Sequence, residues 1–208
     1  MVPKNDLRPR KVPTQPRAIA TVDALVEATA RILVDDGLHG VSTNRIAEVA
    51  GVSVGSLYQY FPSKEALVMA VVERHANNVV TLLSDAFAQA LQEPLPVAID
   101  QLVSAIVDVH DQQPELQHAI VSQVMTLGVH HTAPMHARAV DVVHAFLITR
   151  QEDLLVDDCR SAAWMLVTTV MATLHGRHMG VAPDLGTTSL KVQLTAMIQR
   201  YLLPPSSA

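Results

Sequence analysis

Residues 46–58 read Ile-Ala-Glu-Val-Ala-Gly-Val-Ser-Val-Gly-Ser-Leu-Tyr, and this segment constrains how the rest of the chain can fold. It is typical of two short helices that cross closely at a sharp turn. Ala47 and Ala50 are small enough for the helices to touch, and Gly51 accepts the positive φ that the turn requires. Ser53 can then cap the second helix through its hydroxyl. The sequence therefore predicts a helix-turn-helix.

Helical patterns continue on both sides of this segment. Upstream, apolar residues recur at three- and four-residue spacing from Arg17 until Gly37, which predicts an amphipathic helix that ends at the glycine. Ser42 can cap the first helix of the turn, and Ser63 can cap a long helix that runs towards Pro94. After Pro94 we expect five more helices, at about residues 96–111, 114–128, 134–150, 157–178 and 187–203. We find neither strand alternation nor an internal repeat, so the predicted fold class is all-α.

The second helix of the turn, residues 54–60, carries side chains suited to the major groove of DNA. Val54 can touch a thymine methyl, Gln59 can pair with adenine, and Gly55 lets the backbone come close to the duplex. The amides that follow Ser53 form a phosphate site at the helix start. Hydroxyl and ammonium groups nearby suit phosphates rather than bases: Thr43, Tyr58, Tyr60 and Lys64. The alternative is that the two tyrosines are ordinary core residues, a role that we assign in any case to Leu57 and Phe61.

The segment around this turn resembles a known family. Residues 21–70 are similar to the N-terminal DNA-binding domain of TetR-type transcriptional regulators, over roughly a quarter of the chain. The residues that carry the resemblance are Ser42-Thr43, Ile46-Ala47, Ala50-Gly51-Val52-Ser53, Gly55-Ser56-Leu57-Tyr58, Tyr60-Phe61-Pro62 and Lys64-Glu65-Ala66-Leu67. Ser42 stands where threonine is commoner, and the pair Asn44-Arg45 is less typical of the family.

The resemblance implies a three-helix reading head, joined by a long fourth helix to a helical ligand-binding and dimerisation domain. We accordingly divide the chain into a flexible basic arm (1–16), a helix-turn-helix domain (17–65) and an effector-binding and dimerisation domain (66–208). The resemblance also implies a base or phosphate contact at Arg45. With the groups named above, the expected DNA-binding residues are Arg17, Thr43, Asn44, Arg45, Ser53, Val54, Gly55, Ser56, Tyr58, Gln59, Tyr60 and Lys64.

The first 16 residues read as an extended, mobile arm, because four prolines among them oppose a helix. Arg8, Arg10 and Lys11 can lie along phosphates or enter the minor groove, and a charged tail without contacts is the open alternative. Charge is also distributed unevenly along the chain. Residues 1–75 carry nine Lys and Arg against eight Asp and Glu, whereas residues 76–208 carry six against twelve. One end of the protein can therefore approach a polyanion while the other is repelled.

The second half of the chain carries no motif of its own. Its last two helices are apolar on more than one face, and the resemblance implies that they pair with their copies in a homodimer, through Leu166, Val170, Leu174, Leu194, Met197 and Ile198. The preceding helices are rich in Leu, Val, Ala and Met. In a family that buries ligands there, we expect an apolar effector pocket lined by Leu102, Ile106, Ile120, Val124, Met125, Val140 and Phe146. Plain hydrophobic core is the alternative for each of these residues.

Ten histidines raise metal binding and catalysis as competing functions. His130, His131 and His136 match no standard zinc spacing, so we expect no cofactor and assign the histidines to solvated or capping roles. An enzyme would need a nucleophile beside a histidine base, for which Cys159 and Ser161 are the candidates. The chain has neither a nucleophile-elbow motif nor a Gly-rich phosphate loop. We therefore expect no enzyme, and keep a His-rich hydrolase or metal protein as a remote alternative.

The expected function is a ligand-released repressor. A dimer would bind a pseudo-palindromic double-stranded operator, and a small apolar effector would favour a conformation in which the two heads no longer match adjacent grooves. A ligand-independent or activating regulator is the alternative. No apolar run approaches the roughly 20 residues of a membrane span. The single cysteine excludes an intramolecular disulfide, so we expect the protein in the cytoplasm.

Overall fold

The computed structural model describes residues 7–127, 132–181 and 185–205. These residues form α-helices joined by short loops, with one 3-10 helix, and no strand occurs among them. The bounds are α1 Pro16–Gly40, α2 Thr43–Ala50, α3 Val54–Tyr60, α4 Lys64–Ala90, α5 Leu95–Asp111, α6 Pro114–Leu127, α7 Ala133–Ile148, η2 Gln151–Asp153, α8 Cys159–His178 and α9 Thr187–Leu202. The predicted all-α class is confirmed, and the predicted helices lie within a few residues of the observed ones.

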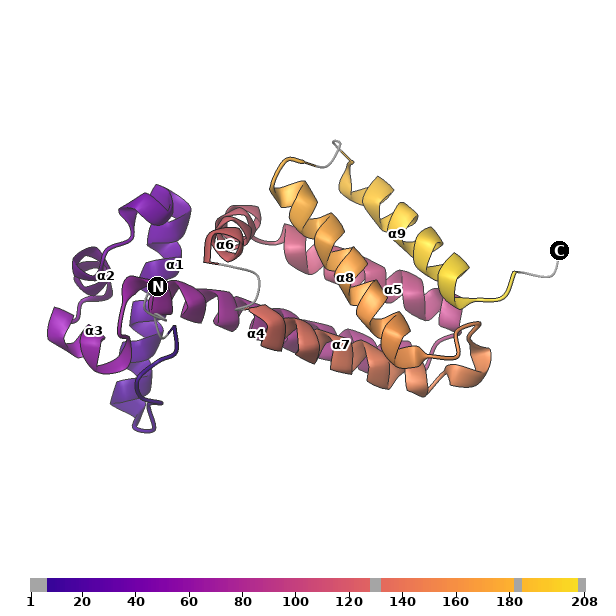
Figure 1. The fold of residues 1–208 in the computed structure, drawn as a ribbon, viewed down its shortest axis with the longest axis horizontal. Coiled ribbons are helices and arrows are strands. Elements are labelled where there is room, and N and C mark those ends of the chain that lie inside the picture. The colour runs from indigo at the N-terminus through magenta and orange to yellow at the C-terminus, as the bar shows by residue number, and fades with distance from the viewer. Residues whose placement is uncertain (1–6, 128–131, 182–184, 206–208) are drawn as a thin grey trace, which may run out of the picture.

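The helices form an elongated molecule with a head and a body (Figure 1). The head consists of α1, α2 and α3 at one end, and α4 leaves it to run into the body, where α5, α7, α8 and α9 lie. Each part has its own hydrophobic core. The head core is centred on side chains that are at most 1 % exposed: Leu25, Ile46, Leu57, Phe61 and Leu67. The body core is built around Val107, Leu147 and Leu174, which are equally buried.

Local signals begin and end the helices of the head as the sequence predicted. The Oγ atoms of Ser42, Ser53 and Ser63 each accept a hydrogen bond from the backbone amide three residues later, at 3.3, 3.0 and 3.2 Å. Each cap satisfies an amide that its helix leaves without a partner. Gly51 has a φ of 68°, and α1 is interrupted at Gly37, which has a φ of 64°. Both glycines therefore supply the left-handed conformation that ends a helix.

Two helices connect the head with the body. The first turns of α4 are buried in the head core as far as Val72, and α4 also packs against α5 of the body. Ile120 of α6 is only 6 % exposed and belongs to the head core as well. Because α6 packs against both α1 and α8, any shift of α6 displaces a side chain that the head core contains. The expected domain division between residues 65 and 66 falls within α4, and the residues of α4 that follow it still belong to the head core.

Five histidines lie on the four helices that meet near this junction, and we call them the histidine seam: His75 of α4, His110 of α5, His118 of α6, and His175 and His178 of α8. His110 is 2 % exposed, and its Nδ1 donates a hydrogen bond to the Ile106 carbonyl at 2.8 Å. The Nδ1 of His118 donates to the His178 carbonyl at 2.7 Å, which joins α6 to α8. The expectation of solvated or capping histidines is therefore wrong for His110, which is a core residue.

Burial determines the charge of the seam. The pKa of His110 is lowered to about 4, mainly by burial and in smaller part by charge repulsion from His175, His75 and His178. Burial also lowers the pKa of His75, His175 and His178. These four imidazoles are therefore neutral at pH 7. Beside them, Arg177 donates to both carboxylate oxygens of Asp111 at 2.8 and 3.1 Å, which ties α8 to α5.

His110 predicts a fold that weakens in acid. Its folded-state pKa of about 4 lies below the ordinary value of 6.5, so between these values the unfolded chain binds a proton that the folded chain does not. The free energy of unfolding should therefore fall by about 3 kcal/mol through this side chain as the pH drops from 6.5 to 4. Denaturant titrations across this pH range should show a shallower pH dependence for His110→Leu than for the wild-type protein.

The matched control for this measurement is His39→Gln, which alters an exposed histidine. It should keep the wild-type pH dependence, because the buried His110 is still present in this variant. If His110→Leu also kept the full wild-type dependence, the assignment to His110 would be wrong.

Candidate nucleic-acid interface

The crossing of α2 and α3 holds the shortest helix of the head in place. Ala47 is 1 % exposed, and its carbonyl accepts a hydrogen bond from the Val52 amide at 3.0 Å, so the turn closes directly against α2. Leu57 and Phe61, 0 and 1 % exposed, anchor α3 in the head core as predicted. The burial of one face leaves the opposite face of α3 outside.

That outer face carries most of the expected reading residues. Tyr58 is 41 % exposed, whereas Val54 and Tyr60 are half-buried and pack against the head core. Tyr60 therefore packs partly into the core, which is the alternative that the sequence left open for both tyrosines, whereas Tyr58 does not. The exposed members of the expected set are Arg17, Asn44, Arg45, Ser53, Gly55, Tyr58 and Gln59.

Three of the groups expected to bind phosphates come from α2, α3 and α4 and have hydrogen-bond partners within the head. The hydroxyl of Tyr58 on α3 lies 3.3 Å from Oγ1 of Thr43 on α2, in a hydrogen bond between the two side chains. Lys64, the first residue of α4, donates through Nζ to the Val41 carbonyl at 3.2 Å. Each group is thus held in one orientation before DNA arrives, which lowers the entropy cost of binding a phosphate.

Three further residues of the expected contact set also have partners within the chain. Arg45 forms an ion pair with Asp36 at 3.0 Å, with side chains that are 52 and 42 % exposed. Such an exposed pair contributes at most about 1 kcal/mol, so a phosphate can compete for the guanidinium. The Ser53 hydroxyl is 2.8 Å from that of Ser56 and also caps α3. Sequence reasoning missed Asp36, because it lies nine residues before Arg45 and meets it only after the kink at Gly37.

Comparison with known proteins covers both parts of the chain. Residues 25–71 match the bacterial regulatory proteins of the tetR family, and residues 94–202 match the tetracyclin repressor-like C-terminal domain. The chain belongs to the TetR family. It is a DNA-binding transcriptional regulator of that family, and this membership implies a regulatory rather than an enzymatic role.

The sequence relatives match only in part. The transcriptional activator FasR of Mycolicibacterium smegmatis is 44 % identical over 57 residues, 27 % of this chain and 26 % of FasR. The transcriptional regulator RutR of Escherichia coli is 45 % identical over 51 residues, 24 % of either chain. The nucleoid occlusion factor SlmA of Glaesserella parasuis is 30 % identical over 91 residues, 44 % of either chain. The chain therefore matches less than half the length of these curated relatives.

Solved structures extend the likeness over the whole fold. A TetR-family regulator from Mesorhizobium loti superposes with a TM-score of 0.70 and 18 % identity, over 89 % of this chain and 96 % of that one. SmeT, the repressor of the Stenotrophomonas maltophilia efflux pump SmeDEF, gives a TM-score of 0.68 and 19 % identity, over 91 and 93 %. At this identity the likeness establishes the fold alone.

The residues expected to line an apolar pocket do not surround one cavity. Ile120 and Val124 pack against the head core. The others that the structure describes lie in or against the body core: Leu102, Ile106, Val140 and Phe146. The Met125 side chain lies outside the described residues. The expected pocket residues are therefore divided between the two cores.

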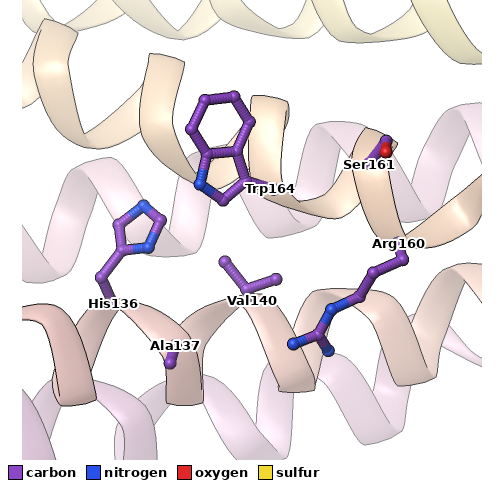
Figure 2. A pocket seen from close by; sticks show the side chains of 6 residues that line it. All are labelled: His136, Ala137, Val140, Arg160, Ser161 and Trp164. Carbon is purple, nitrogen blue, oxygen red and sulfur yellow. The ribbon is translucent and has the colours of Figure 1, made fainter.

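A groove of about 430 Å³ lies instead between α7 and α8, lined by His136, Ala137, Val140, Arg160, Ser161 and Trp164. Figure 2 shows Val140 between the two helices, with Trp164 above it and with His136 and Arg160 towards opposite ends. Trp164 is 55 % exposed, and Arg160 is paired with Asp141. The groove thus combines an indole face and an aliphatic floor with a cation at one end.

The expected dimer residues divide between core and surface. Four of them are buried in the body core of their own protomer: Leu166, Leu174, Leu194 and Ile198. Their side chains therefore present little surface to a second copy, and their place in an interface stays a prediction. Met197 is 39 % exposed and Val170 is half-buried. The apolar residues that do point outwards from α8 and α9 include Trp164, Met165 and Val192.

The candidates for metal binding and catalysis have structural roles where they are described. The Ser161 hydroxyl donates to the Asp158 carboxylate at 2.6 Å at the start of α8, and Cys159 is 3 % exposed in the body core. The described residues contain no group of ligands that could hold a metal ion, and His130 and His131 lie outside them.

None of the described helices has both the length and the apolar character that a bilayer span requires.

Gly55 provides a test of the reading face. A Cβ added there would meet only Ser53 Oγ, at 3.8 Å, so the head has room for a larger residue. Gly55→Leu should therefore melt close to the wild-type protein, and lower the affinity for a DNA site selected by the wild type about ten-fold or more, because the side chain holds the duplex away from α3. Circular dichroism and fluorescence anisotropy of labelled DNA measure the two effects.

The control for this test is Gly55→Ala, which adds one carbon at the same position. It should retain most of the DNA affinity. Full affinity in Gly55→Leu would contradict the close approach of α3 to the duplex.

Proposed function

We propose that the chain is a dimeric repressor that binds a pseudo-palindromic operator with α3 of each protomer and leaves it when an effector binds the body. The observation that carries the proposal is the α2–α3 unit, in which one face of α3 is anchored by Leu57 and Phe61 while Tyr58 and Gln59 stand outside. A helix of seven residues offers few base contacts, so a two-fold pair of heads supplies the specificity that one head lacks.

The proposed contacts separate by chemistry. Val54, Gly55 and Gln59 face base edges, and hydrogen-bonding groups around α3 hold the phosphates. The phosphate-binding set consists of Arg17, Thr43, Asn44, Arg45, Ser53, Ser56, Tyr58, Tyr60 and Lys64. Preformed bonds such as Thr43 to Tyr58 support this assignment, because they hold the hydroxyls on the same side as the exposed face of α3.

The proposed dimer face is the outer surface of α8 and α9. It presents Met165 on α8 and Val192 and Met197 on α9, with exposed fractions between 39 and 58 %. The Tyr201 hydroxyl lies 3.7 Å from Met165 Sδ, so the two helices form one continuous surface at this level. Apolar residues of this size in adjacent helices favour burial against a second copy.

The proposed effector is amphipathic rather than purely apolar. The α7–α8 groove offers Trp164 and Val140 to an apolar body and Arg160 to an acidic group. Arg160 is more than half exposed in its pair with Asp141, so a ligand carboxylate can share it at small cost. Release requires that the ligand bind the DNA-free arrangement better than the DNA-bound one.

A second candidate is an activating regulator. It is favoured by the match to FasR, whose name describes a transcriptional activator and whose 57 matched residues are 44 % identical to this chain. DNA binding and dimerisation are the same in both proposals. A promoter–reporter measurement in cells with and without the gene distinguishes them, because loss of a repressor raises transcription and loss of an activator lowers it.

Met165→Glu tests the dimer face. A buried carboxylate opposite its own copy costs several kcal/mol, so this variant should sediment as a monomer and bind the operator at least about ten-fold more weakly, with unchanged helix content. Leu82→Glu alters an equally exposed leucine on α4 and should remain a dimer. A dimeric Met165→Glu would place the interface elsewhere.

A matched pair of ligands tests the groove. 2-Naphthoate should weaken operator binding several-fold, and 2-naphthalenemethanol, which lacks the charge, should act less strongly. Arg160→Gln should remove the difference between the two, because the carboxylate loses its cation. If neither compound binds the wild-type protein in a thermal-shift assay, this class of effector is excluded while operator binding stands.

A further inference from the structure

The described part of the N-terminal arm lies against the head instead of extending away from it. Leu7 packs on the head core. The amide of Arg10 donates to the Tyr60 carbonyl at 2.7 Å, and its guanidinium donates through one terminal nitrogen to the Tyr58 carbonyl at 3.2 Å. The sequence predicted an extended, mobile arm and left open whether Arg8–Lys11 contact DNA, because nothing local in this segment points to a partner about 50 residues away.

These two bonds matter because of where α3 ends. A helix leaves its last four carbonyls without partners, and in α3 these belong to Leu57, Tyr58, Gln59 and Tyr60. The Leu57 carbonyl accepts from the Phe61 amide at 2.9 Å. Arg10 donates to two of the other three, the Tyr58 and Tyr60 carbonyls. One residue of the arm thus caps two carbonyls at the end of the reading helix.

The charge of Arg10 also suits this place. The C-terminus of a helix carries a partial negative charge, and a cation beside it is stabilising. α3 has neither a basic residue in its last turn nor a glycine in the left-handed conformation after it, since Phe61 follows in an extended conformation. The two usual devices that end a helix are missing from the chain around Phe61, and the arm supplies a substitute from a distance.

We propose that Arg10 is a positioning residue for operator recognition: by bonding the Tyr58 and Tyr60 carbonyls, it holds the last turn of α3 and with it the two tyrosine side chains. The proposal rests on the proposed role of α3 in DNA binding. It differs from a phosphate contact by Arg10, which would act on DNA directly and leave α3 unaffected in the free protein.

Amide hydrogen exchange of the free protein tests the positioning step without DNA. Arg10→Ala removes the guanidinium bond and should speed the exchange of amides in the last turn of α3 about three- to five-fold, the factor expected for a cation lost from a helix end. Arg10→Lys keeps a cation and a donor and should restore most of the protection. Lys11→Ala removes the same charge one residue away on the exposed arm and should leave the exchange unchanged.

Operator titrations at several salt concentrations test the functional step. Arg10→Ala should weaken binding by a similar three- to five-fold factor and leave the salt dependence of the affinity as in the wild type. A lost phosphate contact would instead lower the slope of log K against log salt by about 0.9. In this proposal Arg10 affects DNA binding only by holding the tyrosine side chains in position. Arg10→Lys keeps a cation and a donor, so it should recover both the DNA affinity and the exchange protection.

Two results would overturn the proposal. One is an Arg10→Ala protein with wild-type exchange in α3 and a reduced salt slope, which identifies Arg10 as a direct DNA contact. The other is faster exchange of the same size in Lys11→Ala, which attributes the effect to charge in general. If the wild-type protein binds no DNA while Arg10→Ala still exchanges faster, the proposed function of α3 fails and the positioning bond remains.

Discussion

α3 has seven residues, and a helix of this length is not stable in water by itself. Its shape therefore depends on what holds it from outside. Leu57 and Phe61 insert into the head core, Gly51 allows the turn that lays α3 across α2, and the Ser53 hydroxyl completes its first turn. The proposed DNA recognition by α3 depends on all three, because an unheld α3 would present its side chains in many arrangements and lose affinity through their ordering. Because one face of this short helix is fully buried, its opposite face is held in a fixed orientation towards solvent.

The body can influence this head because the two cores share elements. α4 begins in one core and continues into the other, and Ile120 brings α6 into the head core. Packed cores have discrete arrangements and are not continuously deformable, so a ligand that displaces α6 or α8 forces the head contacts to change with it. The histidine seam lies on these helices. The bond of His118 to the His178 carbonyl joins α6 to α8, and the Arg177–Asp111 pair beside the seam joins α8 to α5, so such a displacement would have to break or preserve both contacts.

Local features of the sequence were sufficient to predict the helices, the three serine caps and the turn at Gly51, because each depends on residues within one or two turns of each other. The assignment of Leu57 and Phe61 to the core also followed from spacing. Which face of α8 points inward did not: Leu166 and Met165 are adjacent and both apolar, and their burial depends on the packing of α5, α7 and α9. Distant partners, such as Asp36 for Arg45 and Arg10 for α3, leave no pattern in a single sequence. The position of a pocket is unpredictable for the same reason, since a cavity depends on what neighbouring helices fail to fill.

Trp164 has a consequence of a different kind. It is the single tryptophan of the chain, it is about half exposed, and it forms one wall of the groove between α7 and α8. The intrinsic emission of the whole protein therefore comes largely from one indole at one place. A molecule that covers the indole excludes water from it and shifts its emission towards the blue, so the unlabelled protein carries its own optical reporter of that groove.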